Sequence, residues 1–315
     1  MAKAKRVKGI NCNSVASIGM KLVLVTRFEE LYGFQETALD WSDPEGVHSM
    51  RVASRRLRSA LRDFTPYLRK RGVNSVQKRL KSLAGVLGEV RDHDVAIIAL
   101  EEIEKRAPAD VSPTLKQFID TRKDRREQAR EELKLVLDKT QLDQLQSDFV
   151  AAVDAATSTK ASQPAPQITY LKMSRAVILD RLKELEKLST DLFKPFEVET
   201  LHEMRIAAKR LRYAVELFQR CWGRSISTYA KRAARVQTAL GDLHDCDVWI
   251  ESFGNAINDA RKQKQDAQVA AYVWLLGHFV KLRSKHLRRA FAEWSKWEAQ
   301  DLGGKLRETL RNKTS

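Results

Sequence analysis

The stretch Val47–Leu61 reads VHSMRVASRRLRSAL and carries two patterns at once. At about 100° per residue on a helix, its apolar side chains fall on one narrow stripe that contains Met50, Ala53, Leu57 and Leu61. Such a stripe predicts an amphipathic helix with one buried face. A second stripe, roughly 140° around the helix, carries the bases His48, Arg51, Arg55, Arg58 and Arg62. Like charges at this spacing repel one another, so the basic stripe predicts an anionic partner.

The same pattern occurs a second time in the chain. The stretch Leu201–Phe218, LHEMRIAAKRLRYAVELF, repeats it 154 positions later, with a second basic stripe of His202, Arg205, Lys209 and Arg212. Glu216 stands at the position that corresponds to Arg62, so the second stripe is shorter. Downstream, LGEVRDHDV (Leu87–Val95) corresponds to LGDLHDCDV (Leu240–Val248). Repetition in the same order and at a nearly constant offset predicts an internal duplication.

Residues 151–167 lie between the two copies and are rich in Ala, Ser, Thr and Pro, which is typical of a linker. We therefore expect a basic N-terminal tail over 1–14, a first repeat over 15–150, this linker, and a second repeat over 168–312. Periodicity and breakers predict four helices in each repeat, at about 15–40, 47–70, 74–106 and 112–149, and at about 168–192, 199–221, 226–263 and 266–311. No stretch alternates with a period of two residues. The expected fold class is all-α, with two pseudo-symmetric four-helix bundles.

The composition bounds the class of protein. Of the 315 residues, 43% are hydrophobic and 31% charged, which is typical of a folded chain rather than a disordered one. The net charge of +16 and the pI of about 9.8 indicate a polyanionic partner, such as nucleic acid, anionic lipid or another polyanion. The longest apolar run, AAYVWLLGHFV (Ala270–Val280), is too short to span a bilayer. We therefore expect no membrane partner.

Further charged residues accompany the two stripes. Two ladders at i, i+4 and i+8 contain Arg122, Arg126 and Arg130 in the first repeat, and Lys281, Lys285 and Arg289 in the second. We include Arg126 and Lys285 among the binding candidates. Two acids recur within the otherwise basic surroundings of each copy, at Asp92 and Asp94, and at Asp245 and Asp247. We predict that these acids orient arginines through charge-assisted hydrogen bonds.

Both copies contain the motif H-x-x-R-x-x-x-[RK]-R-L-R, followed by L-G-[DE]-x-x-D-x-D. On these motifs the chain resembles the CHAD family, named for its conserved histidine α-helical domain, over about residues 15–312. The resemblance implies two pseudo-symmetric four-helix bundles that form a basic central cavity and bind inorganic polyphosphate, in some members at polyphosphate granules. By motif position, the implied binding residues are His48, Arg51, Arg55, Arg56, Arg58, His202, Arg205, Lys209, Arg210 and Arg212, with Lys78, Arg79, Lys231 and Arg232 as additions.

Many relatives carry a phosphohydrolase domain with an E-x-E-x-K signature, which is not found ahead of the first repeat here. We therefore expect a stand-alone binding protein that is not an enzyme and needs no cofactor or metal. We also expect it in the cytoplasm, at polyphosphate granules where these form. The oligomeric state is left open by the sequence.

Three alternatives remain open. A metal-dependent phosphohydrolase would need carboxylates that hold metal ions, and the D-x-D pairs are candidates for that role. The sequence contains no phosphate-binding glycine loop. A metal-chelating protein would use His48, His202, His244 and Cys246, but the histidines lie among cations. A nucleic-acid-binding protein is permitted by the charge, although the bases are not interleaved with exposed aromatics. Weak non-specific nucleic acid binding is expected as a side effect.

Overall fold

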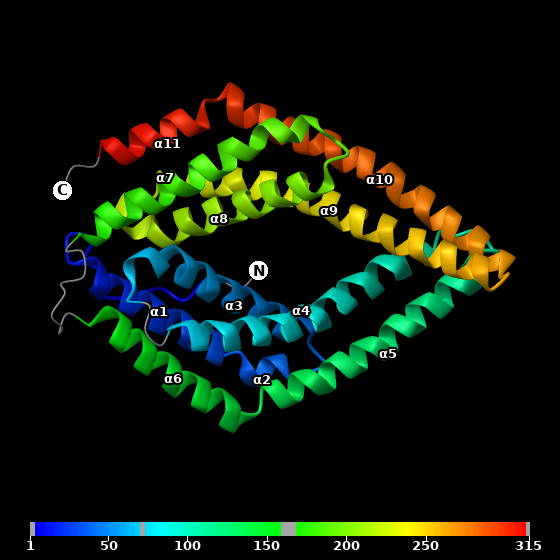
Figure 1. Ribbon diagram of the computed structural model, residues 1–315, viewed down its shortest axis with the longest axis horizontal. Coiled ribbons are helices and arrows are strands. Elements are labelled where there is room, and N and C mark those ends of the chain that lie inside the picture. The colour runs from blue at the N-terminus through cyan, green and yellow to red at the C-terminus, as the bar shows by residue number, and fades with distance from the viewer. Residues whose placement is uncertain (1–3, 70–72, 159–167, 313–315) are drawn as a thin grey trace. The chain divides into compact units, whose positions relative to one another are not determined.

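The computed structural model describes residues 4–69, 73–158 and 168–312, and helices dominate this part of the chain (Figure 1). The helices are α1 (Ala16–Tyr32), α2 (Gln35–Ala38), α3 (Pro44–Phe64), α4 (Val73–Glu104), α5 (Ser112–Val136), α6 (Lys139–Thr157), α7 (Tyr170–Ser189), α8 (Val198–Trp222), α9 (Ser227–Lys262), α10 (Asp266–Ala299) and α11 (Leu302–Arg311). Two short 3-10 turns are η1 (Thr65–Tyr67) and η2 (Thr190–Phe193). Within the described residues the only β pairing is an isolated bridge between Val15 and Thr169. The predicted all-α class is confirmed.

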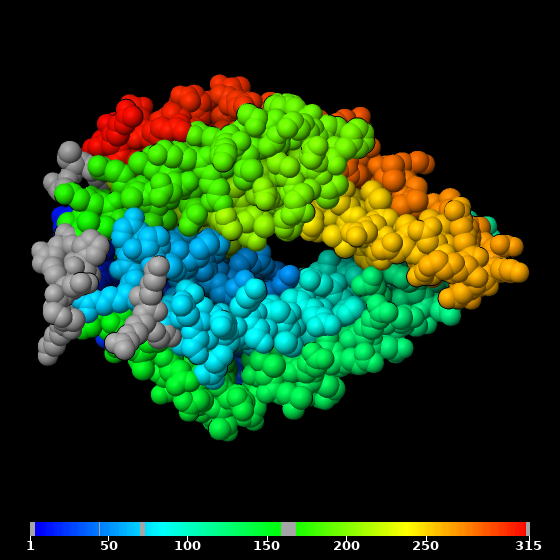
Figure 2. All heavy atoms as spheres, viewed as in Figure 1, coloured from blue at the N-terminus to red at the C-terminus, as the bar shows by residue number. Residues whose placement is uncertain are grey.

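The chain divides into two compact units. Unit 1 comprises residues 1–103 and 118–173, and unit 2 comprises residues 104–117 and 174–315. In unit 1, α1 packs against α3 and α6, and the Phe28 ring of α1 stacks on the Phe149 ring of α6 with centroids 4.7 Å apart. In unit 2, α9 packs against both α8 and α10. Helices α9 and α10 lie side by side along their length, as both views show (Figures 1 and 2).

The motif helices α3 and α8 bury the apolar stripe that their periodicity predicts. In α3, Met50, Ala53, Leu57 and Phe64 are fully buried, and in α8 the same is true of Met204, Leu211, Val215 and Phe218. Burying side chains of this size removes apolar surface from water, which stabilises each unit by roughly 1.5–3 kcal/mol per large residue. The opposite faces of α3 and α8 are therefore left to the bases.

Helix α3 begins three residues earlier than predicted. Asp43 caps it by accepting a hydrogen bond from the backbone N–H of Glu45 at 2.9 Å, and Pro44 occupies the first turn. Residues 44–46, which precede the predicted helix, thus form its first turn. Gly46 is required there because a Cβ at this position would collide with the backbone carbonyl of Thr37.

The prediction of one final helix in each repeat is wrong. In both repeats this segment forms two helices, because an aspartate caps the start of a second helix. The Asp138 carboxylate accepts hydrogen bonds from the backbone N–H groups of Thr140 and Gln141, and so starts α6 after α5. Asp301 adopts a left-handed conformation with φ 44° and accepts from the Gly304 N–H, which starts α11 after α10. Helix α6 then continues to Thr157, seven residues into the predicted linker, while residues 159–167 lie outside the described part.

The described part of the predicted N-terminal tail packs along α1. Val7 and Ile10 are buried, Lys5 Nζ lies 2.7 Å from Glu29, and Arg27 donates a hydrogen bond to the Lys5 carbonyl at 2.8 Å. These contacts order residues 4–14 against unit 1. Residues 1–3 lie outside the described part.

None of the described helices combines the length and the apolar character that a bilayer span requires. This agrees with the short apolar runs of the sequence.

Candidate functional site

The bases of the α3 stripe lie opposite the buried stripe and reach the surface. His48, Arg51, Arg55 and Arg62 are partly exposed, and Arg58 is exposed. Among the described residues, Arg55 and Arg58 have no carboxylate within salt-bridge distance. Burial, followed by the charge of Arg55, lowers the pKa of the Arg58 guanidinium. The middle of the stripe is therefore an uncompensated cluster of positive charge.

His48 begins this stripe beside another unpaired base. Burial lowers the pKa of His48 first, and the nearby charges of Arg91 on α4 and Arg55 lower it further. Arg91 also has no carboxylate partner within the described residues. The sequence did not single it out, although it lies in the repeated LGEVRDHDV segment. The sequence offered one signal for Arg91, which is that it aligns with another basic residue, His244, in the second repeat.

Arg51 lies across α4 at the glycine of the L-G motif. A Cβ on Gly88 would be 3.9 Å from the Arg51 Nε, in ordinary van der Waals contact, so only a side chain larger than alanine would press on the guanidinium. One turn further on, Asp92 holds Arg51 through a 3.0 Å contact between Oδ1 and Nη2. The glycine and the first aspartate of the motif, one helical turn apart on α4, thus both lie next to Arg51.

Arg56 stands off the stripe and serves a different contact. Glu30 accepts from Arg56 through Oε1 and from Arg27 through Oε2, each at 2.6 Å. All three side chains are largely buried. The same atoms pair in unit 2, where Glu184 accepts from Arg210 through Oε1 and from Arg181 through Oε2. Arg56 and Arg210 therefore join helices within their units, and the structure does not bring them to the basic stripes.

Several other candidates of unit 1 are also engaged. Arg79 lies 2.5 Å from Asp148 of α6, whereas Lys78 beside it is exposed. Arg62 Nε lies 3.5 Å from the buried carboxylate of Asp63. These contacts place Arg79 and Arg62 in intramolecular pairs.

Asp94 faces the arginine ladder of α5. Its Oδ1 lies 3.7 Å from Arg126 and 4.0 Å from Arg130. Burial raises the pKa of Asp94 more than these long contacts lower it. Arg126 also donates to Glu127 at 2.9 Å, so the ladder is partly neutralised.

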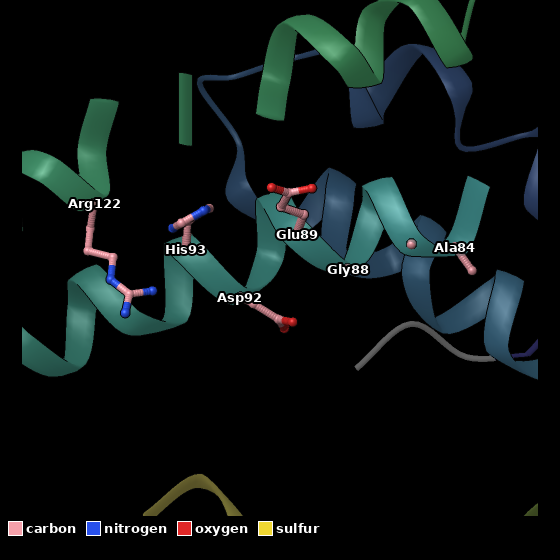
Figure 3. A pocket seen from close by; sticks show the side chains of 7 residues that line it. Ala84, Gly88, Glu89, Asp92, His93 and Arg122 are labelled. Atoms are coloured by element: carbon pink, nitrogen blue, oxygen red, sulfur yellow. The ribbon is translucent and has the colours of Figure 1, made fainter. Parts of the chain in front are cut away.

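A pocket of about 460 Å³ runs along α4 in unit 1. Its lining consists of Ala84, Gly85, Gly88, Glu89, Asp92 and His93 of α4, together with Arg122 of α5. Figure 3 shows Arg122 projecting from α5 beside His93. Burial, followed by the charge of Arg122, lowers the pKa of His93. Small side chains and glycines leave this space open, and its walls carry both signs of charge.

Unit 2 holds a pair of histidines where unit 1 has His48 and Arg91. The Nδ1 atoms of His202 on α8 and His244 on α9 are 3.2 Å apart, and Arg205 Nη2 is 3.5 Å from His202 Nδ1. Arg205 passes Gly241 as Arg51 passes Gly88, with its Cδ 3.9 Å from a Cβ at that glycine. The sequence identified His202 and Arg205 as binding residues, but considered His244 only as a metal ligand.

The remaining bases of the second stripe are less available than those of the first. Arg212 Nε pairs with Glu216, the residue that stands at the position of Arg62, at 2.8 Å. Lys209 is partly exposed and makes further interactions. Arg212 also contacts Gln237 of α9 at 3.4 Å. The second stripe therefore carries fewer unpaired charges.

The second pair of acids and the outer bases are distributed over α9 and α10. Asp247 holds Arg283 of α10 at 2.5 Å, and Arg283 also donates to the Pro195 carbonyl at 2.7 Å. Asp245 is exposed and makes an interaction of its own. The sequence did not identify Arg283. The outer candidates lie on the surface, with Lys231 and Lys285 exposed and Arg232 partly exposed.

Comparison with known proteins shows both the family and the fold. The family model described as CHAD domain matches residues 24–254. The crystal structure of the CHAD domain from the plant Ricinus communis matches with a TM-score of 0.71 at 23% identity, over 91% of this chain and 94% of that chain. PptA from Streptomyces chartreusis matches with a TM-score of 0.67 at 15% identity, over 90% of this chain and 100% of that chain.

At 23% and 15% identity, the two structures show that the fold is shared, and they do not show an activity. No curated protein matches the chain significantly. The family model, however, spans well over half of the 315 residues. The chain belongs to the CHAD domain family.

Proposed function

We propose that this protein binds inorganic polyphosphate through the basic stripes of α3 and α8 and does not catalyse a reaction on it. The observation that carries the proposal is the uncompensated cluster of Arg55 and Arg58 on α3, with Arg55 and Arg91 of α4 both near His48. Membership of the CHAD family, which the sequence resemblance links to polyphosphate, supports the same ligand.

The spacing of the stripe suits a linear polyanion. Arg51, Arg55 and Arg58 span two helical turns, or about 10 Å along the axis. Guanidinium groups remain charged at all relevant pH values and grip phosphate oxygens in a planar fork. A chain of phosphates along α3 would neutralise charges that otherwise repel one another.

Nucleic acid is the second polyanion that the charge permits. Sequence-tolerant binding of single strands uses aromatic side chains on which bases stack. The aromatic rings of the two motif helices, Phe64 on α3 and Tyr213, Phe218 and Trp222 on α8, are all buried. The two basic stripes therefore offer contacts to phosphate and none to the faces of bases.

The acids of the motif support a binding role rather than catalysis. Asp92 is engaged with Arg51, and Asp247 with Arg283, while Asp94 faces Arg126 and Arg130. Carboxylates committed to arginines position those arginines. In the described part of the chain, no three His, Cys, Asp or Glu side chains lie together as ligands of one metal ion.

The decisive experiment measures binding of long-chain polyphosphate at about 150 mM salt, with duplex DNA and RNA as competitors at equal phosphate concentration. We expect polyphosphate to bind and the nucleic acids to compete weakly. The double variant Arg55→Glu/Arg58→Glu should lose about 10- to 100-fold in affinity, because each lost charge-assisted contact is worth on the order of 1 kcal/mol at a partly exposed site.

The matched control is Lys139→Glu/Lys172→Glu, which changes the net charge by the same amount. Both lysines are exposed and lie in the first turns of α6 and α7, where a glutamate suits the helix dipole. The control should bind polyphosphate nearly as the native chain does. Equal losses in both double variants, or DNA competing as well as polyphosphate, would show that net charge alone drives binding.

Two further measurements complete the test. Release of orthophosphate from polyphosphate by the purified chain, with and without Mg²⁺, should equal the buffer blank, and turnover would overturn the non-enzymatic assignment. A fluorescent fusion should gather at polyphosphate granules in cells that accumulate the polymer, and the Arg55→Glu/Arg58→Glu variant should disperse.

A further inference from the structure

The histidine pair of unit 2 has a geometry that fixes where its protons are. The Nδ1 atoms of His202 and His244 lie 3.2 Å apart, with ring centroids separated by 4.3 Å and planes inclined by 55°. Arg205 Nη2 approaches the same His202 Nδ1 at 3.5 Å. Arginine can only donate hydrogen bonds. His202 Nδ1 is therefore the acceptor, and His244 Nδ1 carries the hydrogen that it donates to His202.

This arrangement holds only while His202 is neutral at Nδ1. A proton added there would face the N–H of His244 and the guanidinium of Arg205, both donors, with no acceptor between them. Three cationic or donor groups would then surround one point. Because the two Nδ1 atoms are only 3.2 Å apart, the protonated rings must separate before an anionic oxygen enters and accepts hydrogen bonds from all three groups.

The charges around the pair come from three helices. On α8, Glu199 favours the protonated imidazoles, while Arg205 and Lys209 oppose protonation. On α9, Asp247 favours the protonated form of His244, but that carboxylate is already bound by Arg283 of α10 at 2.5 Å. Burial lowers the pKa of both histidines, and it is the largest influence on each. Without a ligand, these surroundings therefore favour the neutral form of both histidines.

We propose that His202 and His244, together with Arg205, form a proton-dependent subsite that takes up a phosphoryl oxygen when the imidazoles are protonated. This inference rests on the proposed polyphosphate function and adds His244 as a binding residue. The protons come from solvent and neutralise charge on the incoming phosphate. In the first repeat, Arg91 stands at the position that corresponds to His244. Because arginine stays protonated, the charge at this position of unit 1 does not depend on pH.

A metal ion would fit the pair less well. Two imidazole nitrogens make only half of a tetrahedral zinc site, and no third ligand joins them among the described residues. The guanidinium of Arg205 at 3.5 Å would repel a divalent cation. The same cation favours an anion.

The test compares polyphosphate affinity at about pH 7.5 and pH 5.5 in the native chain, in His244→Arg and in His244→Gln. The native chain should gain about tenfold on acidification, which corresponds to a ligand-induced pKa rise of about one unit. His244→Arg should bind tightly at both pH values, and His244→Gln weakly at both, so each shows a smaller gain than the native chain. His278→Gln is the matched control, because His278 of α10 is also held neutral by burial but belongs to no such pair, and its gain should equal the native one.

Calorimetry in two buffers of different ionisation enthalpy supplies a second readout. Polyphosphate binding by the native chain near pH 6.5 should take up protons, and His244→Arg should take up fewer. If His244→Arg keeps the native pH dependence and proton uptake, the subsite is refuted while polyphosphate binding stands. If the native chain binds no polyphosphate at either pH, the proposed function itself fails. Histidine NMR of the free chain separates the two cases further, since independent titration of His202 and His244 would refute the pair without any ligand.

Discussion

Replacing Glu30 by Gln should destabilise unit 1 strongly, although it removes an acid from a chain that already carries a net charge of +16. Glu30 is the shared acceptor of Arg27 and Arg56. Its side chain is 4% exposed, and those of Arg27 and Arg56 are 11% and 12% exposed. A glutamine would present an amide NH₂ to one of the two guanidinium groups.

The magnitude follows from this burial. Removing one partner of a buried ion pair costs about 3–5 kcal/mol, because the remaining charge is left without compensation in a poorly solvated site. The corresponding change in unit 2 is Glu184→Gln, whose group is 25% exposed and whose arginines are 20% and 32% exposed. Solvent screening reduces that cost to about 1.5 kcal/mol, at the lower end for a hydrogen bond to a charged group.

Hydrogen exchange read by mass spectrometry is the assay, because a chain of two compact units is not assumed to unfold in one step. In Glu30→Gln, the protected amides of α1 and α3 should exchange roughly 10²- to 5 × 10³-fold faster, while those of α8 should not change. The Glu30→Gln/Arg56→Met variant should regain part of the protection, since it removes the uncompensated charge.

The reasoning would be refuted if Glu30→Gln changed exchange in α1 and α3 by less than tenfold, or if Glu184→Gln had the larger effect in its own unit.

A related prediction separates the structural role of Arg56 from a role in binding. Arg56→Gln should lower the protection of α1 and α3 and leave polyphosphate affinity at a permissive temperature unchanged. A loss of affinity without a loss of protection would return Arg56 to the binding residues.

Three further predictions concern glycines and histidines. Gly88→Leu should weaken polyphosphate binding severalfold by displacing Arg51, with native circular dichroism; unchanged affinity would contradict the role of the glycine. Gly254→Ala, in the interior of α9 with no atom within 4 Å of the added Cβ, should stabilise the helix by about 0.5–1 kcal/mol in thermal unfolding, and a lower melting temperature would contradict it. Burial lowers the pKa of His48 and His93, so the unfolded chain binds more protons below about pH 6.5. Their contribution to stability should be lost as the pH falls from 6.5 through these lowered pKa values, and replacing both by Gln should flatten urea midpoints over that range.

The helices of this protein could be predicted because their signals are local. The apolar stripes of α3 and α8 repeat every three or four residues, and their members are buried as expected. The breaks within the last predicted helix of each repeat were missed, because each depends on one capping side chain. Asp138 ends a continuous helical pattern by capping α6, and Asp301 does the same for α11 with a left-handed backbone. An aspartate within a helical pattern is equally compatible with a solvated surface position.

The sequence names candidate site residues, but it does not give the role of each one. The periodicity of α3 places Arg56 away from the stripe, but it cannot show that Glu30, on another helix, neutralises it. The role predicted for the acids depends on partners on other helices, such as Arg283 for Asp247. Arg91 and His244 stand at corresponding positions of the repeated segments, but this alignment does not by itself place either base beside its stripe.

The sequence by itself determined the all-α class, the two motif helices, and the family, because helical periodicity and motif spacing are properties of neighbouring residues. Only the tertiary structure decided which charges remain available. Arg55 and Arg56 are adjacent in sequence, yet α1 supplies a buried carboxylate to Arg56 and no described residue supplies one to Arg55. The contact between His202 and His244 likewise exists only because α8 packs against α9. Neutralisation depends on distances through space, and residues far apart in the chain set those distances.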